Sequence, residues 1–361
     1  MLKDTTLVKP GEQQAIESLR DLLEQISIVQ VEGIDAAYAD PSEWRPDFMV
    51  RLHADGQPRQ LICGYRSNGQ PRFARLSLLQ LRDYATRHAP EATPVFIAPY
   101  LSPTVRHLCR AHGVGYIDFT GNAWIAFGGV YIERSVADKP AAEHRELKSL
   151  FKPKSATVLR VLLREPGRAW RVTELSNVSG VSLGHVSNVR TALMDREWAR
   201  VSDEGLVLSQ PDMLLDAWRD SYAAPSGERL CFYTPLHGRA FDEAARPVLS
   251  TDQAVGRAAY ASFSAAQWLA PYARTGTHYF LADKQGLGGL RAVLNLKSTA
   301  QGENVVVTLP KDLDLLADTV EPAPGVICTS PVQTYLDLSI AGERGAEAAE
   351  HLRRKVLSWP K

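Results

Sequence analysis

Residues 170–198 read WRVTELSNVSGVSLGHVSNVRTALMDREW, and this stretch carries the clearest structural pattern in the chain. Apolar residues at helical spacing predict a short helix that opens over residues 170–175 and a longer helix over 182–195. Residues 177–181 lie between them, and Gly180 can adopt a positive φ there without steric cost. Ser182 is a residue type favoured at a helix N-cap. The stretch therefore predicts two helices joined by a tight turn.

The flanking residues extend this pattern on both sides. Residues 155–164 predict a preceding helix, which Pro166 and Gly167 end. Residues 200–208 read RVSDEGLVL and predict a strand, a turn and a second strand. Three helices followed by such a hairpin resemble the winged helix-turn-helix of bacterial transcription regulators. The resemblance implies that the 182–195 helix lies in the major groove of double-stranded DNA.

Under this resemblance the exposed side of the third helix supplies the candidate DNA contacts. Small polar residues at a helix N-terminus can approach phosphates and base edges closely. Asparagine suits adenine, and arginine suits guanine or phosphate. The candidates on this helix are Ser182, Gly184, His185, Ser187, Asn188 and Arg190. The candidates for holding the DNA backbone are Lys152, Lys154, Arg168, Arg171 and Arg200.

The charge of the chain is unevenly distributed, although its formal net charge is zero. Residues 148–200 hold ten Lys or Arg and four Asp or Glu, a local net charge of +6. Because neutralising phosphates releases counterions, a basic segment favours a polyanionic partner. A solvated helical surface is the alternative interpretation. The ten basic residues are Lys148, Lys152, Lys154, Arg160, Arg164, Arg168, Arg171, Arg190, Arg196 and Arg200.

The composition is typical of a soluble globular protein with two or three domains. The chain has 361 residues, of which 45% are hydrophobic and 23% charged. Its apolar runs are shorter than the about 20 residues that a membrane helix needs, and its N-terminus has no export signal. We therefore expect a cytoplasmic protein without membrane contact. The sequence holds no HxxxH, HExxH or GxSxG motif, and we expect no metal, no cofactor and no catalytic residue.

The first part of the chain predicts an α/β layer around one sheet. Its expected helices span 12–28, 75–87 and 103–111, with Ser102 as an N-cap. Its expected strands span 46–52, 59–65, 94–98, 116–119 and 123–127. Residues 54–57 read ADGQ and predict a hairpin turn between the first two strands.

Pro46 and Asp47, a second strand and then a helix resemble the PD-(D/E)XK nuclease fold. In that family an Asp and a Glu-x-Lys hold divalent metal and activate water. Asp47 matches the Asp, but Gly64, Tyr65 and Arg66 occupy the Glu-x-Lys positions. Since Gly64 cannot ligate metal and Arg66 is no base at neutral pH, the resemblance implies a degenerate nuclease. We expect Asp47 to be a capped or paired structural residue. Other carboxylates that could assist it are Glu32, Asp35, Asp40 and Glu43.

Residues 95–127, VFIAPYLSPTVRHLCRAHGVGYIDFTGNAWIAF, resemble segments that precede a winged helix in the type IV antitoxin family called AbiEi. Within them, Asp118 and Asn122 surround a Thr120-Gly121 turn, and local turn chemistry is their expected role. Residues 260–273 and 330–357 are similar to the C-terminal antitoxin domain of that family, which implies a nucleotidyltransferase-like α/β fold.

The C-terminal part offers few other signals. Ser330 and Pro331 predict a helix start, with Val332, Tyr335, Leu336 and Leu338 on its apolar face. Asp312 and Asp314 offer a carboxylate pair, but the Gly-Ser element of nucleotidyltransferases is missing upstream, so we expect a solvated helix end. Four aromatic residues could line an effector pocket, although core packing is favoured: Trp268, Tyr272, Tyr279 and Phe280.

Taken together, the sequence predicts a multidomain protein of mixed α/β (α+β) class. The expected domains are a degenerate nuclease-like domain at 1–147, a winged helix-turn-helix at 148–210 and an AbiEi-antitoxin-like domain at 211–361. The expected function is sequence-specific transcriptional regulation by a homodimer, with the outer domains used for dimerisation, toxin or partner contact, or sensing of a small effector. Two alternatives stay open: an antitoxin that represses its own operon, and a DNA nuclease that uses Asp47.

Overall fold

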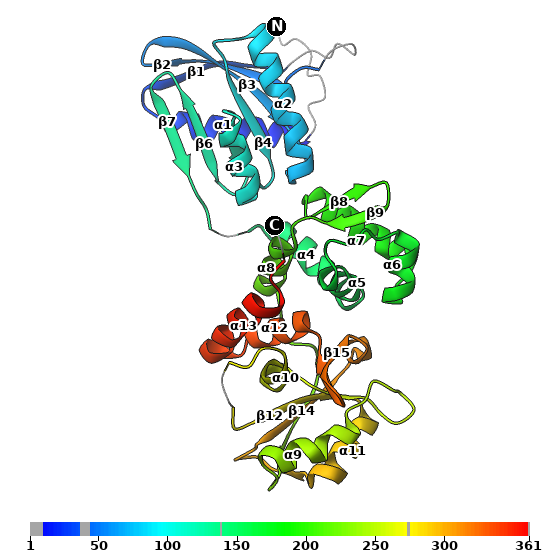
Figure 1. Cartoon of the computed structure of the whole chain (residues 1–361). Helices are drawn as coiled ribbons and strands as arrows, with labels where there is room; N and C mark the ends of the chain where they lie inside the picture. Colours follow the sequence, from blue (N-terminus) through cyan, green and yellow to red (C-terminus); the bar gives the residue numbers. More distant parts are fainter. Residues whose placement is uncertain (1–9, 37–43, 138, 273–274, 360–361) are drawn as a thin grey trace. The chain divides into compact units, whose positions relative to one another are not determined.

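A computed structural model describes residues 10–36, 44–137, 139–272 and 275–359 (Figure 1). The contacts cluster into two compact units. The first unit comprises Met1–Arg145 with Leu193–Glu197, and the second comprises Glu146–Ala192 with Trp198–Lys361. Both units combine helices with β-structure, so the mixed α/β class is confirmed, while the three predicted domain boundaries stay a prediction. Within the described ranges, no helix is long and apolar enough to cross a membrane.

The described part of the first unit contains one seven-stranded sheet, whose strands lie side by side in chain order. The central pairs β3–β4 and β4–β5 are parallel, and the outer pairs are antiparallel. Parallel neighbours need crossover connections, and here helices supply them. The strands are β1 (Val29–Ala36), β2 (Phe48–Ala54), β3 (Gln57–Tyr65), β4 (Thr93–Ala98), β5 (Gly115–Asp118), β6 (Ala123–Phe127) and β7 (Val130–Arg134).

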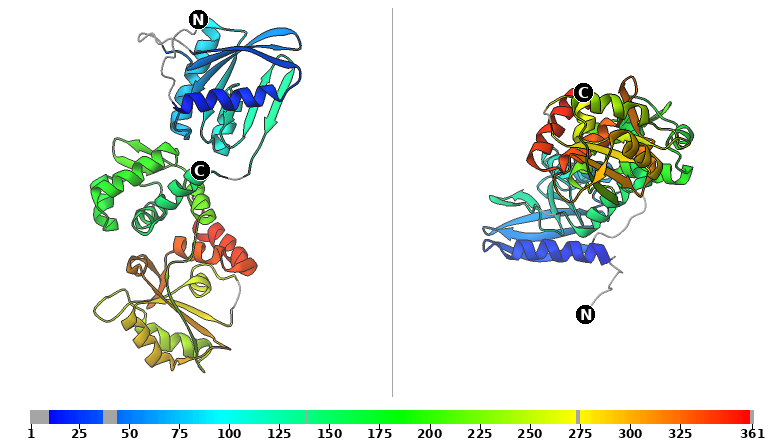
Figure 2. Two further views of the ribbon diagram at one scale, coloured as in Figure 1. Left: turned by 180° about the vertical axis from the view of Figure 1, so that it is seen from behind. Right: turned by 90° about the horizontal axis from the view of Figure 1, so that it is seen from below.

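Helices cover both faces of this sheet. On one face α1 (Pro10–Glu24) buries Leu19 and Leu23 among strand residues such as Phe48 and Ile125. Figure 2 shows α1 crossing that face. On the other face α2 (Pro71–His88) and α3 (Pro103–Ala111) bury Leu78 and Val105. The apolar stripe of each helix therefore meets an apolar face of the sheet.

Several expectations for this unit are confirmed and others are wrong. Asp55 and Gly56 have φ values of 50° and 71°, which confirms a tight hairpin turn between β2 and β3. The Ser102 side chain accepts a hydrogen bond from the Val105 amide, which confirms the N-cap. The first helix ends at Glu24 instead of residue 28, because Val29 begins a strand that pairs with β2. The strands β1 and β7 were not predicted, since each gains its place only by pairing with a neighbour.

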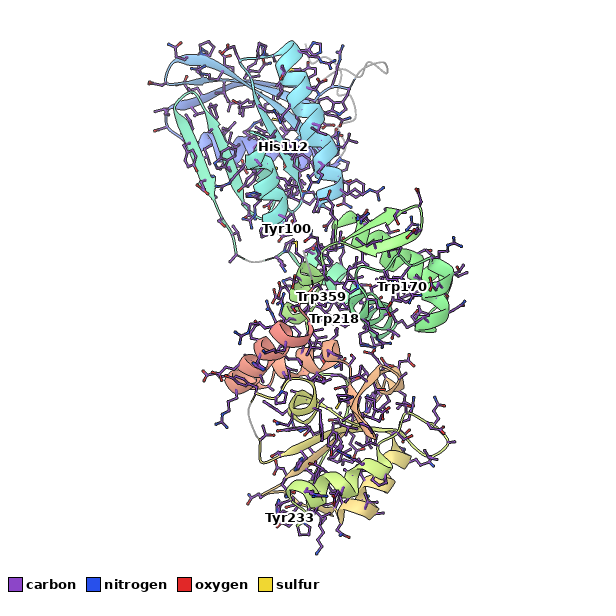
Figure 3. The ribbon with its side chains drawn as sticks, in the orientation of Figure 1. Tyr100, His112, Trp170, Trp218, Tyr233 and Trp359 are labelled. Atoms are coloured by element: carbon purple, nitrogen blue, oxygen red, sulfur yellow. The ribbon has the colours of Figure 1, made fainter. Side chains whose placement is uncertain are left out.

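The second unit begins with a helical segment. Its elements are α4 (Ala141–Leu150, which starts in the first unit), α5 (Pro153–Arg164), α6 (Val172–Ser179), α7 (Leu183–Asp195), β8 (Ala199–Ser202), β9 (Gly205–Leu208) and α8 (Pro211–Asp220). Residues 137–154 are highly charged and have no strong periodicity, which predicts a linker, but α4 lies within them. Its apolar stripe consists only of Leu147 and Leu150, too few residues to show a helical period. Trp218 on α8 stacks on Phe151, with ring centroids 5.6 Å apart (Figure 3).

The second predicted helix starts later than expected. Trp170 is not helical: its amide donates to the Leu206 carbonyl at 2.8 Å, and the Leu206 amide donates back at 2.9 Å. Trp170 therefore extends the β8–β9 hairpin, and α6 starts at Val172 (Figure 3). Gly180 ends α6 with φ 67°, which confirms its predicted role in the turn.

A second seven-stranded sheet forms the described remainder of this unit, in the order β13-β10-β14-β12-β11-β16-β15. Its strands are β10 (Gly227–Tyr233), β11 (Ala258–Tyr260), β12 (His278–Ala282), β13 (Lys297–Ser298), β14 (Val305–Pro310), β15 (Thr319–Ala323) and β16 (Val326–Thr329). It mixes parallel and antiparallel pairs.

Helices flank this sheet as well. Helices α9 (Gly238–Ala245) and α11 (Lys284–Leu294) pack on it through one hydrophobic core, which includes Phe241, Phe280 and Leu290. Helices α12 (Pro331–Ser339) and α13 (Gly342–Val356) pack against each other and against α10 (Ser262–Leu269). Two 3₁₀ turns complete the set, η1 (Arg246–Val248) and η2 (Leu313–Leu316).

Candidate nucleic-acid interface

Helix α7 presents one apolar and one polar side, as predicted. Val186, Val189 and Leu193 are buried. On the opposite side Ser182, Gly184 and Asn188 are exposed, and Ser187 and Arg190 are partly exposed. Ser182 and Gly184 near the start of the helix are short, and Leu183 between them is also exposed. This side of α7 is therefore a polar surface with small side chains at its N-terminus.

His185 lies partly on this surface and also contacts a neighbouring helix. Its Nε2 lies 2.9 Å from the hydroxyl oxygen of Ser155, which is buried on α5. The imidazole is partly exposed and connects α7 to α5. His185 is therefore a candidate DNA contact whose ring already interacts with a residue of α5.

Four of the ten basic residues at 148–200 are in ion pairs. Arg168 pairs with Glu165 at 3.2 Å and with Glu174, and its guanidinium lies 3.9 Å from the Trp170 ring centroid. The expected role of Arg168 in holding DNA is thereby weakened, since binding a phosphate would require these contacts to break. Arg196 pairs with Glu143 at 3.2 Å, and both side chains are largely buried. The other two are Arg160 and Arg164, which share a single carboxylate.

That carboxylate is Asp318, and sequence reasoning missed it. Its two oxygens lie 3.1 Å from Arg160 Nε and 2.5 Å from an Arg164 nitrogen. The Arg160 and Asp318 side chains are only 3% and 9% exposed. The Ser330 hydroxyl also donates to Asp318 at 2.5 Å. This cluster joins α5 to the residues before β15 and to the start of α12. The charges of both arginines are therefore paired, although only Arg160 is buried and the Arg164 side chain stays 48% exposed.

The remaining six basic residues form no ion pair with any residue in the described ranges. Lys148, Lys152, Lys154, Arg171 and Arg200 are exposed, and Arg190 is partly exposed. They lie on α4, at the start of α5, ahead of α6, on α7 and on β8. Their charge is available to an anionic partner because no carboxylate in that part of the structure neutralises it. The candidate interface thus combines the polar side of α7 with these six cations.

The N-terminal site residues have structural roles. Asp47 accepts a hydrogen bond from the Tyr65 amide at 2.7 Å and pairs with Arg66 at 3.2 Å, which confirms the expected paired role. Burial raises the pKa of Asp47. Glu32 and Asp35 pair with His53 and Arg51, while Asp40 and Glu43 lie outside the described residues. No group of three or more potential metal ligands occurs in the described ranges.

Asp118 organises the turn that Thr120 and Gly121 form. It is 1% exposed and accepts hydrogen bonds from the Leu101, Thr120 and Asn122 amides at 3.1, 2.9 and 3.0 Å. The Thr120 hydroxyl and the Asn122 side chain donate to it at 2.6 and 2.9 Å. The turn-chemistry interpretation is therefore confirmed.

The C-terminal candidates are divided between the core and two cavities. Ser330 caps α12, and Val332, Tyr335, Leu336 and Leu338 are buried, as predicted. Asp312 accepts from the Asp314 amide at the start of η2, which agrees with the expected end of a helix. Trp268 lines a cavity of about 820 Å³ together with His237, Asp242 and His278. Tyr279 and Phe280 line another of about 440 Å³, and Tyr272 is exposed.

Asp337 on α12 gives the stability of the protein a testable pH dependence. Desolvation by burial raises its pKa from 3.8 to about 6, although hydrogen bonds from Tyr222 and Gln333 oppose the increase. The folded state then holds this proton more tightly than the unfolded state. The free energy of unfolding should therefore fall as the pH rises from about 4 to about 6, by at most about 3 kcal/mol.

Denaturant unfolding of wild type and Asp337→Asn across pH 4 to 7 measures this effect. Asparagine keeps a carbonyl oxygen for Tyr222 and Gln333 but does not titrate. The stability difference between the two proteins should change over that interval. A difference that stays constant with pH would show that Asp337 does not titrate there.

Comparisons with known proteins give one partial likeness. No family model matches the chain, and no curated protein matches it. A crystal structure of a repair endonuclease from Pyrococcus abyssi is similar over 33% of this chain and 49% of that chain, with 12% identity and a TM-score of 0.23. The chain thus spans about half the length of that protein, and a likeness at this TM-score supports no conclusion about function.

Proposed function

We propose that this protein binds double-stranded DNA in the cytoplasm and regulates transcription, with α7 in the major groove and the β8–β9 hairpin as the wing of a winged helix. The observation that carries the proposal is the set of six exposed or partly exposed cations, without ion pairs in the described ranges, on α7 and on the elements that precede and follow it. Lys and Arg side chains of this kind can neutralise phosphates, while short polar side chains let a helix approach base edges.

The arrangement assigns different roles to different residues. Asn188 and Arg190 carry the side chains suited to reading bases, and Ser182, Gly184 and Ser187 allow close approach. Lys152, Lys154, Arg171 and Arg200 would hold the DNA backbone on either side. Winged-helix regulators of this type bind paired half-sites about one helical turn apart, so we expect two copies of the chain on each operator. The resemblance to AbiEi-family segments supports the same function.

Replacing Arg190 with alanine should weaken binding to a specific site by about 1–3 kcal/mol and relax preference at one base pair. The site is first isolated by footprinting or selection on fragments of the organism's genome, and affinity is then measured by fluorescence anisotropy at fixed salt. Lys355→Ala is the matched control, because Lys355 is an exposed cation on α13 outside the interface. Equal losses in both variants would assign Arg190 a bulk electrostatic role only. Wild-type protein that selects no fragment at modest ionic strength would refute the proposed function.

A further inference from the structure

The cavity of about 440 Å³ in the C-terminal part has the size of a small-molecule site. Strands β10, β12 and β14 line it together with α12 and the residues before β10. Most of its wall is apolar or aromatic and includes Phe263, Tyr279 and Val306. Its charged residues are Asp337 on α12 and the exposed Arg229 on β10. An apolar wall with a few polar groups is typical of a site that orients one small ligand.

Asp337 is a partly exposed carboxylate whose hydrogen bonds reach only one of its two oxygens. Its Oδ1 accepts hydrogen bonds from the Tyr222 hydroxyl at 2.5 Å and from Gln333 Nε2 at 3.0 Å. Its other oxygen has no hydrogen-bond partner in the described part of the chain, where no Lys or Arg forms an ion pair with Asp337 either. A carboxylate beside a mostly apolar cavity wall binds a charged donor more strongly than a neutral one. The free oxygen therefore provides an acceptor for a cationic hydrogen-bond donor.

We propose that this cavity binds a small primary amine with an aromatic or apolar body. Its ammonium group would donate to Asp337, and its body would lie against Phe263 and Tyr279. Charge-assisted hydrogen bonds of this kind are about twice as strong as neutral ones, so Asp337 would select the amine. Arg229 lines the same cavity and could accommodate a carboxylate. The two sources of the chemistry are thus a free amine and an amino acid.

The position of Asp337 connects the cavity to the helical segment. Helix α12 packs against α5, and the positive charge of Arg160 on α5 lowers the pKa of Asp337. Arg160 is also held by Asp318, at the cluster described above. A ligand at Asp337 would change the electrostatic field at Arg160 and so bias α5. This regulatory consequence, unlike the binding site itself, depends on the proposed function.

Calorimetric titration of the full chain at pH 7.5 tests the site, with 2-phenylethylamine, its neutral isostere 2-phenylethanol and phenylalanine as probes. Saturable binding of the amine is expected, with the alcohol weaker by about ten- to a hundredfold. Phenylalanine that binds more tightly than the amine would assign the site to amino acids, and weaker binding would assign it to free amines. Asp337→Asn should weaken the amine by a similar factor, and Glu350→Gln, an exposed carboxylate on α13, should leave it unchanged.

A second variant guards against a folding defect in Asp337→Asn. Ala224 is exposed and lines the cavity, so Ala224→Trp should block the amine while the protein stays folded. The proposal is overturned if no probe binds saturably, or if amine and alcohol bind equally.

The operator affinity is then measured with and without the amine. A shift supports the regulatory link, and its absence removes that link alone. Protein that binds the amine but no DNA would refute the proposed function and leave the site intact.

Discussion

Replacing Asp318 with alanine should lower the free energy of unfolding of the second unit by about 3–5 kcal/mol. The variant removes the carboxylate oxygen that lies 3.1 Å from Arg160 Nε. The Arg160 guanidinium then stays buried without this partner, because its side chain is only 3% exposed. The variant also removes the acceptor of the Ser330 hydroxyl, which caps α12. Breaking a buried ion pair is costly because one uncompensated charge stays in a poorly solvated place.

Chemical denaturation measures the total loss, and hydrogen exchange of peptides from α5 and α12 locates it. Arg160→Met combined with Asp318→Ala should recover most of the stability, because the buried charge is then absent. Arg164→Ala is the matched control: its side chain is 48% exposed, so its removal should cost less than about 1 kcal/mol. A loss in Asp318→Ala no larger than in Arg164→Ala would contradict the assignment of a buried pair.

Replacing Asp118 with alanine should destabilise the first unit by about 3–5 kcal/mol. Asp118 accepts five hydrogen bonds. Three of the donors are the Leu101 amide, the Asn122 amide and the Asn122 side chain. Asn122 is fully buried, so its donors cannot turn to solvent when the carboxylate is lost. A buried donor without a partner costs about 1–3 kcal/mol, and several are created at once.

Asp83→Ala is the control for Asp118→Ala. Asp83 is an exposed carboxylate on α2 that pairs with Arg87 four residues later, and its loss should cost no more than about 0.5 kcal/mol. Hydrogen exchange in the β5–β6 connection should increase in Asp118→Ala and stay unchanged in Asp83→Ala. If both variants unfold at the same denaturant concentration as wild type, the network around Asp118 does not stabilise the unit.

Local chemistry made part of the fold predictable. The turn at Asp55 and Gly56, the caps at Ser102 and Ser330, and the glycine that ends α6 each depend on residues a few positions apart. The inward side of α7 followed in the same way from apolar residues at helical spacing. Such features are encoded by propensity and periodicity, and both can be read without knowing what lies opposite in space.

Other features depended on partners distant in the sequence. Strand β1 exists because β2 pairs with it, and Trp170 is extended because Leu206 bonds to its backbone. Helix α4 buries only two of its residues, Leu147 and Leu150. In each case the deciding interaction joins segments that are distant in the sequence, and no local pattern shows that they lie close together. Periodicity alone therefore predicted the wrong secondary structure for these residues, or none.

By itself, the sequence determined the mixed α/β class, the polar side of α7 and the ten basic residues at 148–200. Only the tertiary structure decided which of those charges are free. Arg160 and Arg164 are held by Asp318, more than 150 positions away, as Arg168 is by Glu165 and Glu174 and Arg196 by Glu143. The physical reason is that charge is a property of a residue, whereas its neutralisation and burial are properties of the neighbours that folding brings to it.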